Sequence, residues 1–306
     1  MISIIGAGKV GSAVAFLCAA SGLDDIVLVN RDEKKAIGEA LDITNAIPNN
    51  SKISVLGTSD YSQIKNSDVL VIAASVKSHI NTRSDIMLDQ AKMMTGMAQK
   101  ISEFAPNSKV LVVTNPVDVM TYLVQKCGNL DPKNVIGVAS SLDSARFRYV
   151  LAKELGADQS RIKDALVMGE HDDSMVPIFS CAKFGQTPLD NVLDESKKSQ
   201  ITMTVRSYWK SLRDYKGSSV YGIAKNTFDV INAIIKNEPL DICASTLVSG
   251  QYGIDGICMG VPVTITKDGI TQIRQIPVTE EEKQQLHKSA GMIQNNIAQV
   301  SGFLKI

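Results

Sequence analysis

Short, continuous apolar runs alternate with amphipathic stretches along the first half of the chain. Runs of β-branched residues without strict alternation are typical of strands that are buried on both faces of a parallel sheet. The six predicted strands are Ile2–Ile5, Ile26–Val29, Ile53–Leu56, Val69–Ala73, Val110–Val113 and Val135–Val138. Amphipathic helices are predicted between most of them, at Lys9–Ser21, Glu33–Ala46, Arg83–Phe104 and Val117–Lys126. This order predicts an α/β fold with a Rossmann-type, doubly wound parallel sheet of six strands.

The regular alternation of strands and helices ends near Ala139, and we expect the rest of the chain to form an α+β substrate domain. Its predicted helices are Ser144–Leu155, Asn191–Leu212 and Tyr221–Lys236, and its predicted strands are Ala165–Met168, Ile178–Cys181, Thr246–Ser249, Val261–Thr266 and Ile270–Gln275. Thr279, with Glu282 three residues later, predicts a capping box at the start of a last helix. We therefore expect a dinucleotide-binding domain over residues 1–140 and a substrate-binding, catalytic domain over residues 141–306, with a cleft between them.

Composition and charge narrow the range of functions. The chain has 306 residues with 32 Lys+Arg and 32 Asp+Glu, so its formal charge is zero and no nucleic-acid partner is expected. No apolar run approaches the ~20 residues that cross a bilayer, and residues 1–5 lack the basic leader of a signal peptide. The five cysteines are scattered without C-x-x-C spacing, which indicates buried thiols. We therefore expect a cytoplasmic protein without a membrane segment or a metal site.

A glycine-rich turn joins the first predicted strand to the first predicted helix, with the sequence Gly6-Ala7-Gly8-Lys9-Val10-Gly11. In such a G-x-G-x-x-G turn, Gly6 permits the tight turn, Gly8 allows close approach of a pyrophosphate, and Gly11 lets the helix pack on the sheet. The free N–H groups of the helix N-terminus would bind the phosphates. Because the turn lies between a strand and a helix, we interpret it as a dinucleotide site. Its expected contacts are Gly6, Gly8, Lys9, Val10 and Gly11.

The second predicted strand is followed by Asn30 and Arg31, where dinucleotide-binding proteins usually carry an acidic residue that holds the adenosine ribose. Asn30 would not repel a 2′-phosphate, and Arg31 could pair with one. We therefore hypothesise that NADP is accepted at least as well as NAD. The alternative is that Asn30 bonds to the ribose and that Arg31 only covers the adenine.

Three polar segments carry the residues expected to do chemistry: Thr114–Asp118, Ser141–Phe147 and Gly169–Pro177. Asp143 and Arg146 are three residues apart on a predicted helix, so both project from one side of its first turn. We expect His171 to take the proton of a substrate hydroxyl while a hydride leaves the same carbon for a nicotinamide. Asp143 would orient the imidazole and raise its pKa, and Arg146 would bind a substrate carboxylate.

With these motifs, the chain resembles the lactate/malate dehydrogenase family over essentially its whole length, and especially its archaeal-type malate dehydrogenases. The resemblance implies the same roles for the imidazole, the carboxylate and the guanidinium. It also implies that Asn115 contacts both substrate and nicotinamide, and that Arg83 is a lid arginine that polarises the substrate carbonyl. Ser219 is implied to line the substrate pocket. Further cofactor contacts are expected from Ala73, Ala74, Ser75, Gln90 and Val113.

The segment that corresponds to the family's lid departs from the pattern of malate-selective members. These members usually carry Pro-Arg-Lys-Pro-Gly, whereas residues 76–83 read Val-Lys-Ser-His-Ile-Asn-Thr-Arg. Lys77 falls at the place of the arginine that recognises the second carboxylate, and a lysine attracts a carboxylate without the fork geometry of arginine. We therefore predict malate and oxaloacetate as substrates, with lactate or another 2-hydroxy acid as the alternative. The resemblance further implies a homodimer or homotetramer.

Two other functions are compatible with the same scaffold. An NAD-dependent glycosidase would need a metal-binding set of cysteines and histidines, and the cysteines of this chain lack that placement. A non-catalytic nucleotide-binding protein would have no need for His171, Asp143 and Arg146. The other two histidines, His79 and His287, are interpreted as an exposed loop residue and an inert residue on the last helix.

Overall fold

The structure is a computed structural model that describes residues 1–76 and 83–305, and only the backbone of residues 83–85. The parallel strands of the first half are β1 (Ile2–Ile5), β2 (Ile26–Val29), β3 (Val55–Thr58), β4 (Val69–Ile72), β5 (Lys109–Val112) and β6 (Val135–Gly137). The helices between them are α1 (Lys9–Ala20), α2 (Glu33–Thr44), α3 (Arg83–Phe104) and α4 (Val117–Gly128). The strand order β3-β2-β1-β4-β5-β6 is that of a doubly wound Rossmann fold, which confirms the predicted fold class.

The second half combines long helices with antiparallel strands. Its helices are α5 (Ser140–Glu154), α6 (Glu195–Lys216), α7 (Tyr221–Lys236) and α8 (Glu280–Leu304). Its strands are β7 (Ile162–Lys163), β8 (Leu166–Met168), β9 (Val176–Ile178), β10 (Lys183–Phe184), β11 (Thr187–Pro188), β12 (Leu240–Ser249), β13 (Asp255–Thr266) and β14 (Gly269–Ile273). Short 3-10 helices lie at Tyr61–Ile64, Pro132–Asn134, Gln159–Arg161, Leu189–Asn191 and Gln251–Gly253.

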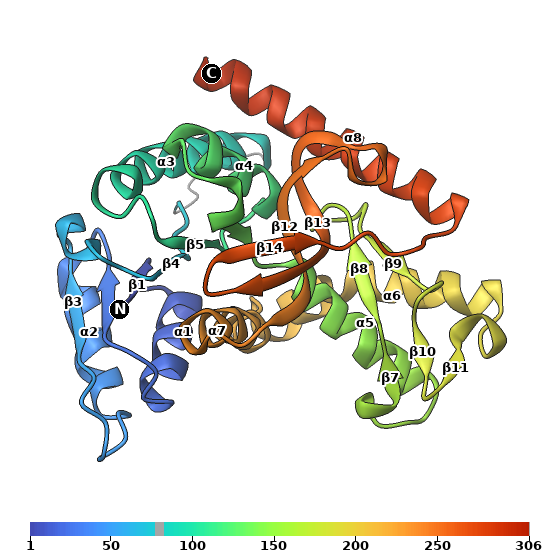
Figure 1. Cartoon of the computed structure of the whole chain (residues 1–306), viewed down its shortest axis with the longest axis horizontal. Coiled ribbons are helices and arrows are strands. Elements are labelled where there is room, and N and C mark those ends of the chain that lie inside the picture. The colour runs from blue at the N-terminus through green and yellow to red at the C-terminus, as the bar shows by residue number, and fades with distance from the viewer. Residues whose placement is uncertain (77–82, 306) are drawn as a thin grey trace.

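The parallel strands are covered by helices on both faces. Every residue of β1, β2 and β4 is buried. Helix α1 packs against α2 and α7, whereas α3 packs against α4 and α8, and these two groups lie on opposite faces of the sheet (Figure 1). Coverage from both sides explains why these strands read as continuous apolar runs in the sequence.

The strands β12, β13 and β14 extend the main sheet beyond β6, so that it has nine strands. The junction is the antiparallel pairing of Ser245 on β12 with Gly137 on β6. A Cβ at position 137 would lie 2.6 Å from the Cβ of Ser245, so only glycine allows this close approach. The sequence predicts strands in this region but not their pairing with the parallel sheet. As a result, one sheet crosses from the first half of the molecule into the second (Figure 1).

Buried apolar side chains form two cores. The larger core follows the nine-stranded sheet and the helices on its faces, and the smaller one lies in the second half around Phe147 of α5. The ring of Phe147 meets the ring of Phe179 edge to face, with 5.0 Å between their centroids. This smaller core fixes α5, the helix that carries Asp143, which is predicted to be catalytic, and Arg146, which is predicted to bind the substrate.

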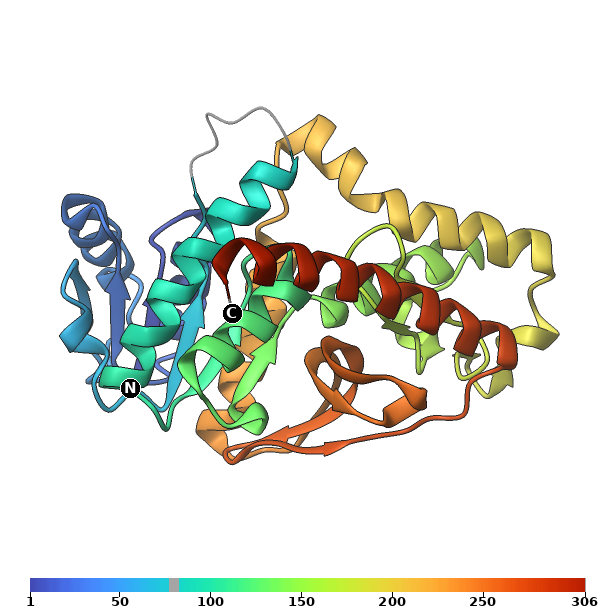
Figure 2. The ribbon, with the colours of Figure 1, turned by 90° about the horizontal axis from the view of Figure 1, so that it is seen from above.

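Capping side chains set the start of two long helices. The predicted capping box is present, because Thr279 accepts a hydrogen bond from the N–H of Glu282 and the Glu282 carboxylate accepts one from the N–H of Thr279. Helix α6 begins four residues later than predicted, because Asp194 caps it by accepting a hydrogen bond from the N–H of Lys197. Helix α8 then runs along both halves of the molecule and contacts α3 and α4 as well as β9 and β13 (Figure 2).

Candidate active site

The glycine-rich turn and the segment after β4 lie against each other at the carboxyl edge of the sheet. β1 and β4 are neighbours at the point where the strand order reverses, which is where open α/β sheets bind ligands. Gly6 has a φ of +115°, and a Cβ there would lie 2.8 Å from backbone atoms of Ala73 and Ala74. A Cβ at Gly11 would lie 1.9 Å from the carbonyl oxygen of Gly6. Both glycines are therefore required by the fold itself.

Gly8 differs from these two glycines because its surroundings are open. A Cβ at this position would have no atom of the described residues within 4 Å. Gly8 is the N-cap of α1 and has no side chain that could cap the helix. The first N–H groups of a helix have no partner within the helix. The helix then begins with Lys9, which is exposed, and Val10, which is half-buried. The open backbone and the free N–H groups fit the pyrophosphate of a dinucleotide.

Asn30, which follows β2, is tied to the glycine-rich turn. Its Oδ1 accepts a hydrogen bond from the N–H of Ala7 at 3.2 Å, and its Nδ2 donates one to the carbonyl oxygen of Asp32 at 3.0 Å. The neighbouring Arg31 is exposed. Asn30 therefore positions the turn, and Arg31 leaves a positive charge at the end of the site where the adenosine is expected.

Two buried polar side chains hold the segment after β4. Gln90 of α3 accepts a hydrogen bond from the N–H of Val76 at 3.0 Å and donates one to the carbonyl oxygen of Ala74 at 3.2 Å. Thr114, after β5, donates a hydrogen bond to the same carbonyl oxygen at 2.7 Å. Gln90 thus positions the backbone in which cofactor contacts are predicted, and Asn115 lies exposed directly after Thr114.

One carboxylate joins the predicted proton acceptor to the predicted anion-binding residue. Asp143 Oδ2 lies 2.5 Å from Nδ1 of His171, and Asp143 Oδ1 accepts a hydrogen bond from Nη1 of Arg146 at 3.0 Å. Asp143 and Arg146 come from α5, and His171 comes from the loop between β8 and β9. Among the described residues, Nε2 of His171 has no hydrogen-bond partner. This second ring nitrogen is therefore the one available to exchange a proton with a ligand.

Burial and nearby charges act in opposite directions on the pKa of His171. Burial disfavours the imidazolium and lowers the pKa, whereas the charges of Asp143 and Asp118 and the hydrogen bond to Asp143 raise it. The charge of Arg146 lowers it, but the net effect is a pKa above the ordinary value for histidine. The imidazole therefore keeps its proton to a higher pH than a free histidine does, as suits a group that gives and takes a proton near neutrality.

Arg146 is a buried cation with an unused donor. Its side chain is 8% exposed, and its guanidinium lies over the ring of Tyr208 of α6, 5.5 Å from the ring centre. Within residues 1–76 and 83–305, the Nε of Arg146 has no hydrogen-bond partner. A guanidinium with a free N–H beside a proton-exchanging imidazole fits a ligand that carries a carboxylate next to a hydroxyl or carbonyl group.

The loop that carries His171 is anchored by two elements from the end of the chain. Gly169 exchanges two backbone hydrogen bonds with Gly260 of β13, at 2.9 and 3.0 Å. Ser289 of α8 accepts a hydrogen bond from the N–H of Glu170 at 2.7 Å. These contacts hold the imidazole against α5.

Two charged side chains to which the sequence assigns no role also hold this loop. Arg206 of α6 donates two hydrogen bonds to the carbonyl oxygen of Met175, at 2.8 and 2.9 Å. Asp118 of α4 accepts a hydrogen bond from the N–H of His171 at 2.8 Å. Asp118 lies in the polar segment after the fifth strand, so the sequence marks it as a candidate. Arg206 contacts a residue 31 positions earlier, and no local spacing predicts that contact.

The constellation does not test the roles of three other predicted site residues. Lys77 and the side chain of Arg83 lie outside the described residues, although the backbone of Arg83 begins α3. His79, which is interpreted as an exposed loop residue, also lies outside them. Ser219 is half-buried in the segment between α6 and α7. The roles of Lys77, Arg83 and Ser219 stay predictions from the resemblance.

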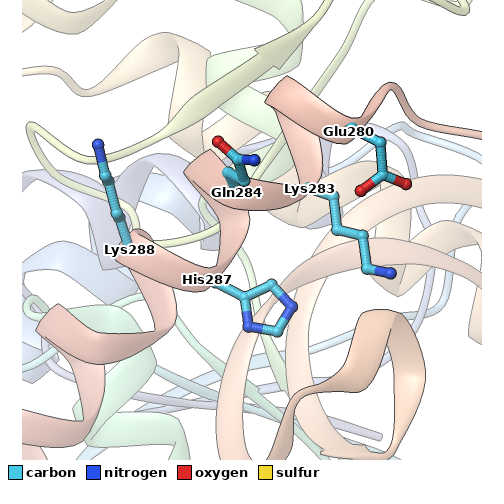
Figure 3. Close-up of a pocket in the computed structure, with 5 residues that line it drawn as sticks. All are labelled: Glu280, Lys283, Gln284, His287 and Lys288. Carbon is cyan, nitrogen blue, oxygen red and sulfur yellow. The ribbon is translucent and has the colours of Figure 1, made fainter.

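His287 lies apart from the predicted site, on α8. A hollow at this helix is lined by Glu280, Lys283, Gln284, His287 and Lys288 (Figure 3). The Nε2 of His287 is 3.0 Å from the carbonyl oxygen of Tyr252. In the described part of the chain, no helix is long and apolar enough to cross a membrane, and no cluster of three or more His, Cys, Asp or Glu residues could hold a metal ion.

The fold and the site together define an NAD-dependent dehydrogenase. Residues 1–137 match the family model for the NAD-binding domain of lactate/malate dehydrogenases, and residues 140–304 match that for their alpha/beta C-terminal domain. The chain therefore belongs to the lactate/malate dehydrogenase family, as the resemblance of its motifs predicts.

Similar proteins carry both of the family's names. The chain is 33% identical to the malate dehydrogenase of Rhodopirellula baltica over 309 residues, which cover 99% of this chain and 98% of that one. The structure of the malate dehydrogenase from Aeropyrum pernix is 30% identical, with a TM-score of 0.91 and coverage of 97% and 98%. The lactate dehydrogenase from Cryptosporidium parvum, solved with lactic acid and NAD, is 31% identical, with a TM-score of 0.93 and coverage of 98% and 97%.

Replacing Gly8 by alanine is expected to preserve the fold and to weaken NADH binding. Gly8 has φ −91° and ψ −177°, which alanine adopts readily, and its Cβ would enter the open space where phosphates are expected. We expect an unchanged midpoint of thermal unfolding and about tenfold weaker binding, equivalent to about 1.4 kcal/mol, in a fluorescence titration with NADH.

Gly11→Ala is the matched control for this experiment. Its Cβ would overlap the carbonyl oxygen of Gly6, so this variant should lower the unfolding midpoint as well as the affinity for NADH. If Gly8→Ala bound NADH as tightly as the parent protein, the phosphates would not lie at this turn.

Proposed function

We propose that this protein is a malate dehydrogenase, which transfers a hydride reversibly between malate or oxaloacetate and NAD or NADP, with His171 as the proton acceptor. The observation that carries the proposal is the shared carboxylate of Asp143, which holds the imidazole of His171 and the guanidinium of Arg146 together. Oxidation of a 2-hydroxy acid needs both groups, because a base must take the hydroxyl proton and a cation must hold the neighbouring carboxylate.

Each of the three side chains has its own task in the proposed reaction. Arg146 binds the substrate carboxylate and aligns the carbon that carries the hydroxyl group. Nε2 of His171 accepts the hydroxyl proton during oxidation and returns a proton to the carbonyl oxygen during reduction. Asp143 keeps a proton on Nδ1 and stabilises the imidazolium that forms. When bound, the nicotinamide supplies or accepts the hydride.

The remaining contacts in the proposal come from the resemblance. Asn115 would contact both substrate and nicotinamide, and its exposed position after β5 supports this. Arg83 would polarise the substrate carbonyl, and Ser219 would line the substrate pocket. The proposed cofactor contacts are Gly6, Gly8, Lys9, Val10, Gly11, Asn30, Arg31, Ala73, Ala74, Ser75, Gln90, Val113 and Asn115.

The choice of malate over lactate depends on Lys77. A cation at this position attracts the second carboxylate of malate or oxaloacetate, which lactate and pyruvate lack, although lysine does so without the fork geometry of arginine. Lactate or another 2-hydroxy acid is the second candidate, and the similarity to lactate dehydrogenases such as that of Cryptosporidium parvum favours testing it. The proposed enzyme is a homodimer or homotetramer and is located in the cytoplasm.

A panel of 2-keto acids tests the proposed activity. Purified protein should oxidise NADH or NADPH with oxaloacetate faster than with pyruvate, as followed by the loss of absorbance of the reduced cofactor. His171→Asn should bind NADH normally and lose roughly 10²–10⁴-fold in turnover, because that is the usual contribution of general acid–base catalysis. Faster turnover of pyruvate would assign a lactate dehydrogenase instead. Binding of NADH without turnover of any keto acid would leave only the non-catalytic function.

Replacing Lys77 by glutamine tests whether this residue selects dicarboxylates. We expect the KM for oxaloacetate to rise about tenfold, because a charge-assisted contact is lost, while the KM for pyruvate changes little. Lys126→Gln is a matched control, since it removes an exposed lysine from the last turn of α4. Equal effects of Lys77→Gln on both substrates would mean that Lys77 does not discriminate between them.

We also propose that NADP is accepted at least as well as NAD. Asn30 brings no negative charge to the end of β2, and its amide oxygen is already engaged by the N–H of Ala7. The exposed guanidinium of Arg31 could pair with a 2′-phosphate.

Asn30→Asp should shift the cofactor preference towards NAD. The substitution keeps the oxygen that accepts the hydrogen bond from Ala7 and adds a charge that repels the 2′-phosphate. We expect the ratio of kcat/KM for NAD to that for NADP to rise about tenfold. Asn45→Asp adds the same charge at the exposed end of α2 and should leave the ratio unchanged. A large preference of the parent protein for NAD would rule out the NADP proposal.

A further inference from the structure

Asp118 is a buried carboxylate that contacts the backbone of the β8–β9 loop, which carries His171. It lies in the first turn of α4 and is 3% exposed. Its Oδ2 accepts a hydrogen bond from the backbone N–H of His171 at 2.8 Å, and its Oδ1 accepts one from Oγ of Ser245 on β12 at 2.6 Å. Both oxygens are thus engaged, each by an element distant in sequence from α4.

Burial and hydrogen bonding act in opposite directions on the carboxylate of Asp118. Burial raises the pKa of Asp118 to about 6, and the hydrogen bonds from Ser245 and from the His171 N–H act against this rise. The N-terminal turn of α4 also favours a negative charge. Because a pKa of about 6 lies below neutrality, most of the carboxylate is charged at pH 7.

We propose that Asp118 is a positioning residue for the reaction proposed above: its buried carboxylate fixes the backbone of His171 and, together with Asp143, favours the protonated imidazole. The inference rests on the role proposed for His171. Asp143 acts on the ring directly through Nδ1, whereas Asp118 acts through the main chain and through its charge. A neutral side chain of the same shape at position 118 would remove the negative charge near His171 and could keep both hydrogen bonds.

Several other groups set the environment in which this charge acts. Among the described residues, the charged and titratable groups that act on the imidazole or on Asp118 are Asp143 and Arg146 from α5, Cys258 from β13 and Glu170 on the loop itself. Asp143 and Asp118 raise the pKa of His171, and Arg146 opposes them. Asp118 is therefore the contributor that can be removed without breaking the contact to Nδ1.

Asp118→Asn tests the inference because it removes the charge and keeps the shape. The amide oxygen can still accept the N–H of His171, and the amide nitrogen can donate to the hydroxyl of Ser245. The chain has only three histidines, so the imidazole of His171 can be followed by NMR titration of the cofactor-free protein and assigned with His171→Asn. We expect the pKa of His171 to fall by roughly one pH unit in Asp118→Asn.

Asp118→Asn should lower the rate of keto-acid reduction at alkaline pH. Reduction of the keto acid needs the protonated imidazole, so its rate should begin to decline at a lower pH in Asp118→Asn than in the parent protein. We expect kcat to fall about tenfold at pH 8, with little change in KM, because Asp118 does not contact the substrate in this proposal. An unchanged imidazole titration together with an unchanged pH profile would overturn the inference.

Two further variants separate this role from simple structural damage. Ser245→Ala removes the hydroxyl that stabilises the ionised form of Asp118, so it should lower the pKa of His171 in the same direction by a smaller amount. This variant also tests the inference if Asp118→Asn does not fold. Glu282→Gln is a matched control, because it neutralises another buried carboxylate, one that accepts hydrogen bonds from Ser180. Glu282→Gln should leave the pKa of His171 unchanged. If it shifted this pKa as much as Asp118→Asn does, the inference would also be overturned.

The titration remains informative if the proposed function fails. A parent protein that turns over no keto acid would remove the dehydrogenase assignment, yet the pKa of His171 would still report whether Asp118 acts on it. Conversely, normal turnover with an imidazole that does not respond to Asp118→Asn would remove the role of Asp118 alone.

Discussion

The buried carboxylate of Asp143 is the group on which the rest of the site depends. It lies between an imidazole and a guanidinium, and these partners compensate a charge that would be costly to bury alone. Removing one member of such a buried set typically costs about 3–5 kcal/mol, because the remaining charge is left without its partner. Stability and chemistry therefore draw on the same three side chains, and the fold must hold them at fixed separations.

The main sheet meets this requirement through its backbone. Strand β6 leads directly into α5, which carries Asp143, and β12 and β13 follow β6 in the sheet. Gly260 of β13 pairs in turn with Gly169, two residues before His171. A continuous series of strand pairings thus connects the start of α5 to the loop with the imidazole. Because backbone pairings have nearly fixed spacings, the distance between carboxylate and ring is set by the sheet.

Much of the fold is predictable from the sequence because its signals are local. The helix Tyr221–Lys236 is predicted with its observed limits, and the predicted dinucleotide-binding nature of the first half agrees with its match to an NAD-binding domain. Helix α5, in contrast, begins at Ser140, four residues before its predicted start. Its first turn is buried in the tertiary structure, where a Cβ at Gly260 would collide with the hydroxyl of Ser140. A contact of this kind leaves no local pattern.

The site was predictable where residue type implies chemistry and not where only tertiary contact does. An imidazole, a carboxylate and a guanidinium in separate polar segments suggest a shared reaction, and the structure brings these three together. The contact of Asp118 with Ser245 joins residues 127 positions apart, and the pairing of Gly137 with Ser245 also spans the two halves. No periodicity or spacing in a single sequence encodes such contacts.

In the proposed enzyme, the residues that carry out the reaction and the residue that selects the substrate lie in different segments of the chain. The carboxylate, imidazole and guanidinium belong to α5 and the β8–β9 loop, and they suit any 2-hydroxy acid because they recognise only the group that every such acid shares. The residue proposed to distinguish malate from lactate, Lys77, belongs to the segment after β4. In this proposal, the residue that selects the substrate is separate in sequence from the residues that carry the chemistry. The chain is similar in structure to both a malate dehydrogenase and a lactate dehydrogenase, with TM-scores of 0.91 and 0.93, so the fold alone does not distinguish the two substrates.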